Sequence, residues 1–260
     1  RRSADGWQVA LALLQSPGCN DHAKFFSLST LQSLLGPEPG LDQAARAALR
    51  GVLLGWVGAA AAEETFIRTK LGVVLALCIK ADYPEQWPSA FTDLTSLVHH
   101  GPANTELYLR VLAAVDEEIV AYHVDRSPTE VARNSLIKDT MRATGAVGEL
   151  CGAVASAVRT QAEANPSLAS LALETLQRYI GWIDAAHVTS EAFLALVYEC
   201  LGRQNMAEAA LGCILEVVNK GMDEGSRLEL LARLRVFALL EGLRGLEEDA
   251  HEGLHPALLL

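Results

Sequence analysis

Aromatic residues, strand-forming runs and long hydrophobic segments are all scarce in this sequence of 260 residues. Only 6% of the residues are aromatic, and β-branched runs bounded by turn residues, which mark strands, are absent. The longest apolar stretches, 51–62 and 71–79, are shorter than the roughly 20 residues that span a bilayer. The composition therefore argues against strand-rich folds, and the sequence predicts no membrane insertion. Half of the residues are hydrophobic, so material for an all-α core is plentiful.

Paired cysteines and phosphate-binding loops are also missing. The five cysteines lie far apart and form no Cys-x-x-Cys motif, which predicts buried thiols in a reducing compartment. Neither Gly-x-x-x-x-Gly-Lys nor Gly-x-Gly-x-x-Gly occurs. Cys19 and His22 have a ligand-like spacing but lack a second pair, and His99-His100 is typical of a polar helix end. We expect no catalytic residue, no enzyme activity, no metal site and no cofactor.

Positive charge is scarce as well. The net charge of −11 argues against a surface that binds nucleic acid over its whole extent, because phosphate binding leaves a basic footprint. Any such contact is expected to be local. An acidic protein equally suits docking to a basic patch on another protein, and charge alone does not separate the two cases.

Helical periodicity, interrupted by short Pro/Gly turns, fills most of the chain. The predicted helices cover residues 7–14, 21–35, 41–60, 63–80, 88–99, 105–122, 128–142, 150–164, 166–182, 190–201, 207–219 and 226–240. Helices that begin near Asp21, Glu63 and Asn104 recur at about 41 residues, within the range of HEAT repeats, and we predict that they open successive pairs. The predicted fold is all-α: an α-solenoid of HEAT-like antiparallel helix pairs, as a fragment of a longer superhelical array. Its repeat region is expected over 1–240, followed by an acidic tail or truncated repeat over 241–260.

Residues 126–142 stand out because they combine a complete helix start with a concentration of basic residues. Ser127 can cap the helix, Pro128 occupies its first position, and Glu130 completes a capping box. The sequence therefore predicts a helix from this point, and glycines from Gly145 to Gly152 predict a bend or break before Leu150.

We expect this helix to present two different faces. Its apolar side is predicted to comprise Ala132, Leu136, Ile137 and Met141. Polar residues recur every fourth position and are predicted to be accessible to solvent: Asn134, Lys138 and Arg142. Such a row of polar side chains can bind an anion, or it can simply be exposed to solvent.

Two groups of segments resemble a known family of transport proteins. Glu64–Leu71, Tyr83–Phe91 and Leu107–Leu112 resemble the N-terminal region of the importin-β/exportin superfamily. Three further segments resemble the narrower exportin-T family of tRNA export receptors: Arg133–Arg142, Tyr179–Asp184 and Glu216–Asp223. The resemblance extends to about Leu240, with the segments in the expected order.

The resemblance implies a nuclear export receptor that binds tRNA cooperatively with the GTP-bound small GTPase Ran and releases it in the cytoplasm. It implies shuttling between nucleus and cytoplasm through the pore, with nuclear pore proteins as further partners. Arg68 and Lys70 become candidates for the surface that meets Ran, although they equally suit a pair of solvated charges. The candidates for tRNA contact are Arg133, Asn134, Lys138, Arg142 and Lys220. They suit phosphate binding better than base reading, because tRNAs share a backbone shape while their sequences differ.

Alternatives remain open at this point. Tyr83, Trp87 and Trp182 can stack on bases, but aromatic residues at helix ends more often pack adjacent repeats together. The whole chain can also be a general HEAT-repeat scaffold, or a nuclear transport receptor for a protein cargo. Salt-dependent tRNA binding distinguishes these functions.

Overall fold

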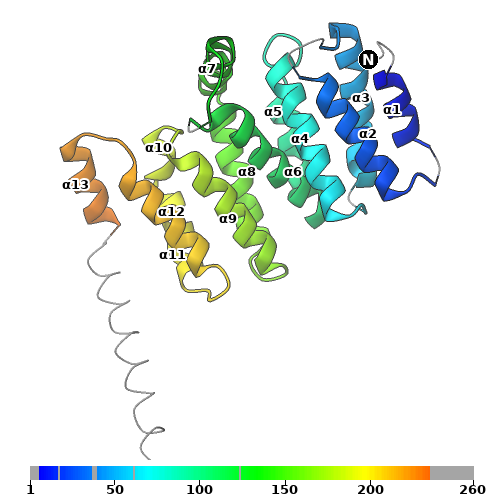
Figure 1. The fold of residues 1–260 in the computed structure, drawn as a ribbon. Helices are drawn as coiled ribbons and strands as arrows, with labels where there is room; N and C mark the ends of the chain where they lie inside the picture. Colours follow the sequence, from blue (N-terminus) through cyan, green and yellow to red (C-terminus); the bar gives the residue numbers. More distant parts are fainter. Residues whose placement is uncertain (1–5, 17, 37–39, 61, 123, 235–260) are drawn as a thin grey trace, which may run out of the picture.

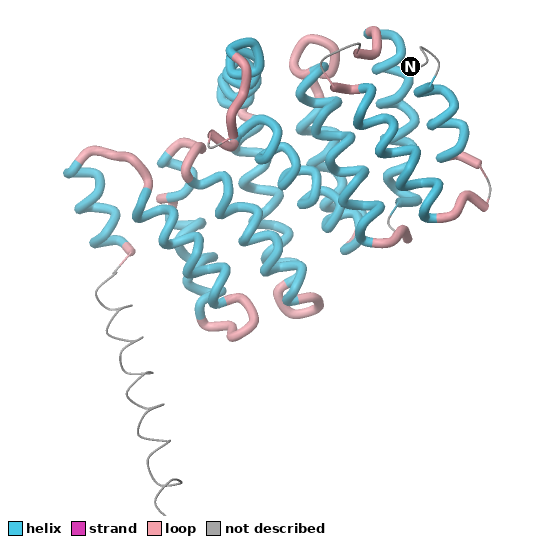
Figure 2. The backbone as a smooth tube through the Cα atoms, viewed as in Figure 1, coloured by secondary structure: helices cyan, strands magenta, loops and turns pink. Residues whose placement is uncertain are grey.

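The computed structural model of this chain describes residues 6–16, 18–36, 40–60, 62–122 and 124–234. Its described residues form helices and turns without a strand, as the sequence predicts (Figures 1 and 2). The α-helices are α1 (Gly6–Leu14), α2 (Asp21–Leu34), α3 (Gln43–Ala60), α4 (Thr65–Asp82), α5 (Ala90–Thr95), α6 (Pro102–Val115), α7 (Pro128–Ala143), α8 (Ala146–Gln161), α9 (Pro166–Ile180), α10 (Ala185–Val188), α11 (Glu191–Leu201), α12 (Ala207–Asn219) and α13 (Glu224–Arg233). A 3-10 helix, η1 (Ser96–His100), follows α5, and a π-helical turn, η2 (Asp116–Val120), ends α6.

The helices stack in two layers. Helices α2, α4, α6, α9 and α12 contact one another in that order and form one layer (Figure 1). The other layer contains their partners, α1, α3, α5, α8 and α11. This arrangement confirms the predicted α-solenoid of helix pairs. The predicted order within the pairs was wrong. The helices that begin at Asp21, Thr65 and Pro102 are the second members of their pairs and not the first.

The centre of the stack is the contact between α4 and α6. Leu71 and Leu75 of α4 and Val111 of α6 are completely buried, so both helices contribute to one continuous core. Gly72 permits a close approach, since a Cβ atom at this position would lie 3.1 Å from the carbonyl carbon and oxygen of Arg110. The layer that contains both helices is therefore fixed by shape as well as by apolar burial.

The aromatic residues after α4 pack between repeats. Tyr83 and Trp87 are only 1% and 4% exposed, and the Tyr83 ring meets Phe91 edge-on with ring centroids 5.0 Å apart. The Trp87 indole N–H donates to Asp93 over 2.7 Å. Tyr83 and Trp87 thus have the packing role that the sequence favoured over base stacking.

Helix α7 lies outside the two layers and is seen nearly end-on in Figure 1. It contacts the C-terminal part of α4, the π turn η2 and α8. Gly145, with a φ of 79°, separates α7 from α8, and α8 then runs without interruption through Gly148 and Gly152. The predicted break is therefore confirmed at Gly145 but absent from the glycines that follow.

Other boundaries differ from the prediction as well. The short helix α10 and the π turn η2 were not predicted, because neither has a periodicity that a short window can reveal. Helix α13 is described as far as Arg233, within the predicted helix 226–240. The predicted end of that helix and the predicted tail over 241–260 lie outside the described residues.

Candidate functional site

The start of α7 is built as the sequence predicts. The Ser127 hydroxyl oxygen accepts a hydrogen bond from the Glu130 N–H over 3.3 Å, while the Ser127 N–H donates to the Glu130 carboxylate over 3.1 Å. This capping box fixes where the helix begins and hence where each later side chain points.

The faces of α7 differ from the prediction. Ile137 and Met141 are completely buried, as expected, but Asn134 is also buried and Leu136 is 45% exposed. Ala132 is exposed as well. The reason is geometric, since positions 134, 137 and 141 are separated by three and four residues and lie on one face of a helix, whereas 132 and 136 lie opposite. Asn134 was therefore assigned to the wrong side.

Asn134 is used inside the protein. Its side-chain amide donates to the backbone carbonyl of Glu118 over 3.0 Å, at the π turn before α7. Glu118 also pairs with Lys80 at 3.2 Å, and Lys80 pairs with Glu130 of α7 at 3.3 Å. A buried Asn134 in this network holds α7 against the layers and cannot reach an external phosphate in this structure.

Arg133 fastens α7 to the end of α4. Its guanidinium donates to the backbone oxygens of Lys80 and Ala81 over 2.9 and 3.1 Å, and to that of Tyr83 over 2.5 Å. It also pairs with Glu85 at 3.0 Å. The free carbonyls at the C-terminus of a helix attract a cation, so this position stabilises the guanidinium and neutralises the helix end.

Arg142 lies at the other end of α7, beside the turn after α9. Its guanidinium carbon is 4.8 Å from the centroid of the Trp182 ring, and the group donates to the Trp182 backbone oxygen over 3.2 Å. Asp139 pairs with it at 3.1 Å and Asp184 at 3.9 Å. The Arg142 side chain keeps 35% of its surface exposed, so it can meet a ligand while its plane is held in place.

Lys220 approaches the same turn from the end of α12. Its ammonium donates to the backbone oxygens of Ile180 and Gly181 over 2.9 and 3.1 Å. Burial lowers the pKa of Lys220, Arg142 lowers it further, and Asp184 acts in the opposite direction. The structure thus brings Arg142 and Lys220 together around residues 181–184, although they are 78 positions apart in the sequence.

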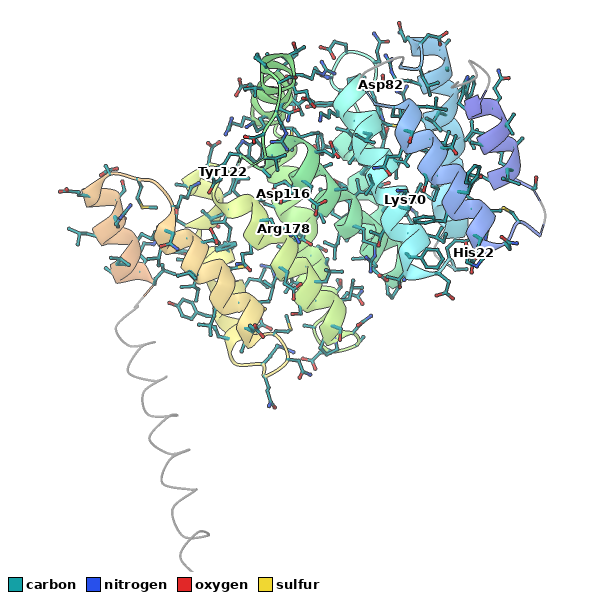
Figure 3. All side chains as sticks on the ribbon, viewed as in Figure 1. His22, Lys70, Asp82, Asp116, Tyr122 and Arg178 are labelled. Atoms are coloured by element: carbon teal, nitrogen blue, oxygen red, sulfur yellow. The ribbon has the colours of Figure 1, made fainter. Side chains whose placement is uncertain are left out.

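Lys138 faces a pocket of about 670 Å³ between α7, η2, α9 and α12. Burial, together with the charges of Arg142 and Arg126, lowers the pKa of Lys138, and Asp139 opposes this shift. Asp116, Tyr122 and Arg178 lie at this junction of helices (Figure 3). The sequence did not reveal this pocket, because its walls come from segments about 100 residues apart.

Arg68 and Lys70, the candidates for contact with Ran, lie on α4. This helix belongs to the layer formed by α2, α4, α6, α9 and α12. Arg68 pairs with Glu106 of α6 at 2.9 Å, and its side chain is only 14% exposed. Lys70 donates to the side chain of Gln32 on α2 and sits 5.1 Å from the centroid of the Phe25 ring. Both residues therefore tie α4 to its neighbours, and Lys70 also borders an open surface (Figure 3).

That surface is apolar. Phe25 and Phe66 are 42% and 45% exposed, with ring centroids 5.8 Å apart, and they line a hollow of about 510 Å³ together with Lys70. Helical spacing alone would place Phe25 with the buried Leu28 and Leu31 of α2, but Phe25 lies near the start of that helix and remains partly exposed. Exposed aromatic residues of this kind mark interaction surfaces.

The expectation of no metal site overlooked one motif in the sequence. The chain does carry a His-Glu-x-x-His spacing, from His251 to His255, which is a zinc-binding motif when it lies on a helix. These residues lie outside the described part of the chain. Within the described part, no group of three or more His, Cys, Asp and Glu side chains is placed to hold a metal ion, and all five cysteines are free.

Two stacked layers of helices with charged and aromatic side chains at their edges define the class of helical-repeat binding proteins. None of the described helices has the length and hydropathy that a membrane crossing requires. Residues 64–214 match the family model of exportin 1-like proteins, which is more than half of the chain. The chain belongs to the exportin 1-like family.

Its relatives confirm the narrower resemblance. The chain is 33% identical to exportin-T of Homo sapiens over 238 residues, which cover 89% of this chain and 25% of that protein. It is 31% identical to exportin-T of Danio rerio over 255 residues, covering 96% of this chain and 26% of the relative. Exportin-T of Dictyostelium discoideum is 32% identical over 217 residues, which cover 82% and 20% respectively. The chain thus spans about a quarter of the length of these relatives.

Proposed function

We propose that this chain is part of a nuclear export receptor that binds tRNA together with RanGTP in the nucleus and releases it in the cytoplasm. The observation that carries the proposal is the similarity to exportin-T over most of the chain, combined with the exportin 1-like match over 64–214. Such a receptor shuttles through the nuclear pore, where pore proteins are its further partners. The proposal assigns transport and no enzyme activity.

For the tRNA contact we propose the edge around residues 181–184. Arg142 is the best placed of the predicted residues, because it is partly exposed and its guanidinium plane is held against Trp182. An arginine held in this way can bind a phosphate by donating two parallel N–H···O hydrogen bonds. Lys220 adds a positive charge beside it, and Lys138 lies in the pocket that Trp182 also lines. Arg133 and Asn134 contribute indirectly, by fastening α7.

For RanGTP we propose the surface of the second-helix layer around Lys70. This surface combines a cation with the exposed rings of Phe25 and Phe66, and aromatic residues beside a charge are frequent anchors of protein interfaces. Arg68 lies next to it, but its ion pair with Glu106 gives it mainly a supporting role.

A transport receptor for a protein cargo is the second candidate. It is favoured by the net charge of −11 and by the extent to which Arg133 and Lys220 are engaged with backbone oxygens of this chain. These engagements reduce the number of cations that are available to phosphates.

Equilibrium binding by the complete receptor separates the two functions. Labelled tRNA is titrated with the receptor in the presence of RanGTP, RanGDP or no GTPase. The γ-phosphate of GTP orders the switch regions of the GTPase, and GDP does not. We therefore expect tight tRNA binding only with RanGTP. Equal affinity in all three conditions, or no tRNA binding in any of them, argues against the proposal.

A further inference from the structure

The pocket that contains Lys138 holds charges that the protein itself does not balance. Arg178 pairs with Asp116 at 3.7 Å and with Glu117 at 3.8 Å, so these groups neutralise one another. Lys138, on the α7 wall, has no hydrogen bond or ion pair within the described residues. A half-buried ammonium without a partner lacks full hydration and attracts an anion.

A second donor, on a residue that also lines the pocket, lacks an acceptor as well. The indole N–H of Trp182 is buried and has no hydrogen-bond partner within the described residues. Trp182 lines the pocket together with Lys138. This N–H is covered by other atoms, so it can report on a ligand that binds Lys138 but is not itself open to one.

Two other residues that line the pocket carry charge of the opposite sign. Glu174 and Glu216 line the pocket and make no ion pair within the described residues. An RNA strand brings a phosphate with every nucleotide and no cation, so its neighbouring phosphates would face these carboxylates. A peptide that carries an acidic side chain between basic ones matches both the cation and the two carboxylates.

We propose that this pocket binds a segment of a partner protein in which one acidic side chain lies between basic side chains. The carboxylate of the partner pairs with Lys138, and its basic side chains pair with Glu174 and Glu216. The volume of about 670 Å³ accommodates a few side chains of such a segment. This inference goes beyond the proposed function and does not depend on it.

A model peptide tests the proposal on the full chain. The probe is an acetylated and amidated heptapeptide with one glutamate between two lysines, and the readout is the Trp182 indole N–H resonance, identified by its loss in Trp182→Phe. We expect a saturable shift with a Kd of about 1 mM or tighter. Lys138→Gln should weaken binding at least about tenfold, and Lys138→Arg should retain it. Arg159→Gln, which removes an exposed cation of α8 outside the pocket, should leave binding unchanged.

Several results overturn the proposal. One is the absence of a saturable shift, and another is an equal shift with a peptide in which glutamine replaces the glutamate. A third is a shift that Lys138→Gln leaves intact while circular dichroism shows a folded chain. If a single-stranded RNA oligonucleotide of mixed sequence binds in this pocket more tightly than the peptide, the pocket belongs to the RNA contact instead.

Discussion

The guanidinium of Arg142 lies over the indole ring of Trp182, with its carbon 4.8 Å from the ring centroid. This contact joins the end of α7 to the turn after α9, which are 40 residues apart in sequence. It also determines which surface the guanidinium presents to solvent. The proposed tRNA contact depends on this relationship, because an arginine that is already oriented loses less conformational freedom when it binds a phosphate.

Replacing Arg142 by alanine should therefore weaken tRNA binding by the complete receptor with RanGTP. If one phosphate contact is lost, the slope of log affinity against log salt should shrink by roughly 1, and tRNAs with different anticodons should be affected alike. Arg203→Ala is the matched control, since Arg203 is similarly exposed and also pairs with two acids, at the far end of α11. An Arg142→Ala receptor with unchanged affinity and slope would remove this residue from the tRNA contact.

Reversing the charge of Lys70 should weaken RanGTP binding. Lys70→Glu places a carboxylate beside the Phe25 ring and among the exposed aromatic residues, while the buried face of α4 is untouched. Arg159→Glu, on the exposed side of α8, is the control with the same charge change. Affinity can be measured by isothermal titration calorimetry. Equal affinities for wild type and both variants would place the GTPase elsewhere.

A matched pair of truncations in α7 tests its observed orientation. Ile137 is completely buried, so Ile137→Ala should lower the free energy of unfolding by about 2 to 5 kcal/mol. Leu136 is 45% exposed, and Leu136→Ala should cost less than about 1 kcal/mol. Denaturant melts of both variants give the comparison. If Leu136→Ala lowers the free energy of unfolding more than Ile137→Ala does, the observed orientation of α7 is contradicted.

Arg133 should be irreplaceable by lysine. The guanidinium satisfies backbone oxygens of Lys80, Ala81 and Tyr83 and also pairs with Glu85, which a single ammonium cannot do. We expect Arg133→Lys to destabilise the docking of α7 by on the order of 2 kcal/mol. Hydrogen exchange should then show faster exchange in α7 and little change in α11 and α12. Unaltered exchange in α7 would show that its docking does not depend on Arg133.

Acid should loosen the start of α7. Hydrogen bonds from the Ser127 hydroxyl and N–H, with a smaller effect of Lys80, hold the pKa of Glu130 below its usual value. A lowered pKa in the folded state means that Glu130 contributes stability above the unfolded pKa of about 4.3, and that this contribution is lost as pH falls through the folded pKa. The stability difference between wild type and Glu130→Gln should therefore be full above about pH 5 and shrink at lower pH. A difference that is constant down to pH 3 would contradict this account.

The residues explain how far the sequence could predict the structure. The Ser127 capping box and the helix starts at Pro128 and Pro166 were predictable, because each depends on neighbours within one turn. The spacing of Asn134 from Ile137 and Met141 also placed it on their face, but its acceptor, a carbonyl of the π turn 16 residues earlier, could not be predicted. Local patterns describe local structure, and α7 is placed by distant partners.

The candidate site divides in the same way. The basic character of Lys138, Arg142 and Lys220 is visible in the sequence, but their surroundings are not. Lys220 was predicted to contact phosphate, and the structure shows it bound to carbonyls at the end of α9. Whether a cation is available to a ligand depends on which groups the fold brings to it, which single-sequence spacing does not reveal.

Export of tRNA from nuclei tests the central claim most directly. Labelled tRNA is loaded into the nuclei of permeabilised cells, and its loss is followed after addition of the complete receptor with Ran and GTP. We predict that the receptor accelerates the loss of tRNA, and that a non-hydrolysable GTP analogue outside the nucleus keeps the released fraction bound to the receptor. If nuclear tRNA is retained while a protein cargo leaves at the same receptor concentration, the proposed function is contradicted and the second candidate is the correct one.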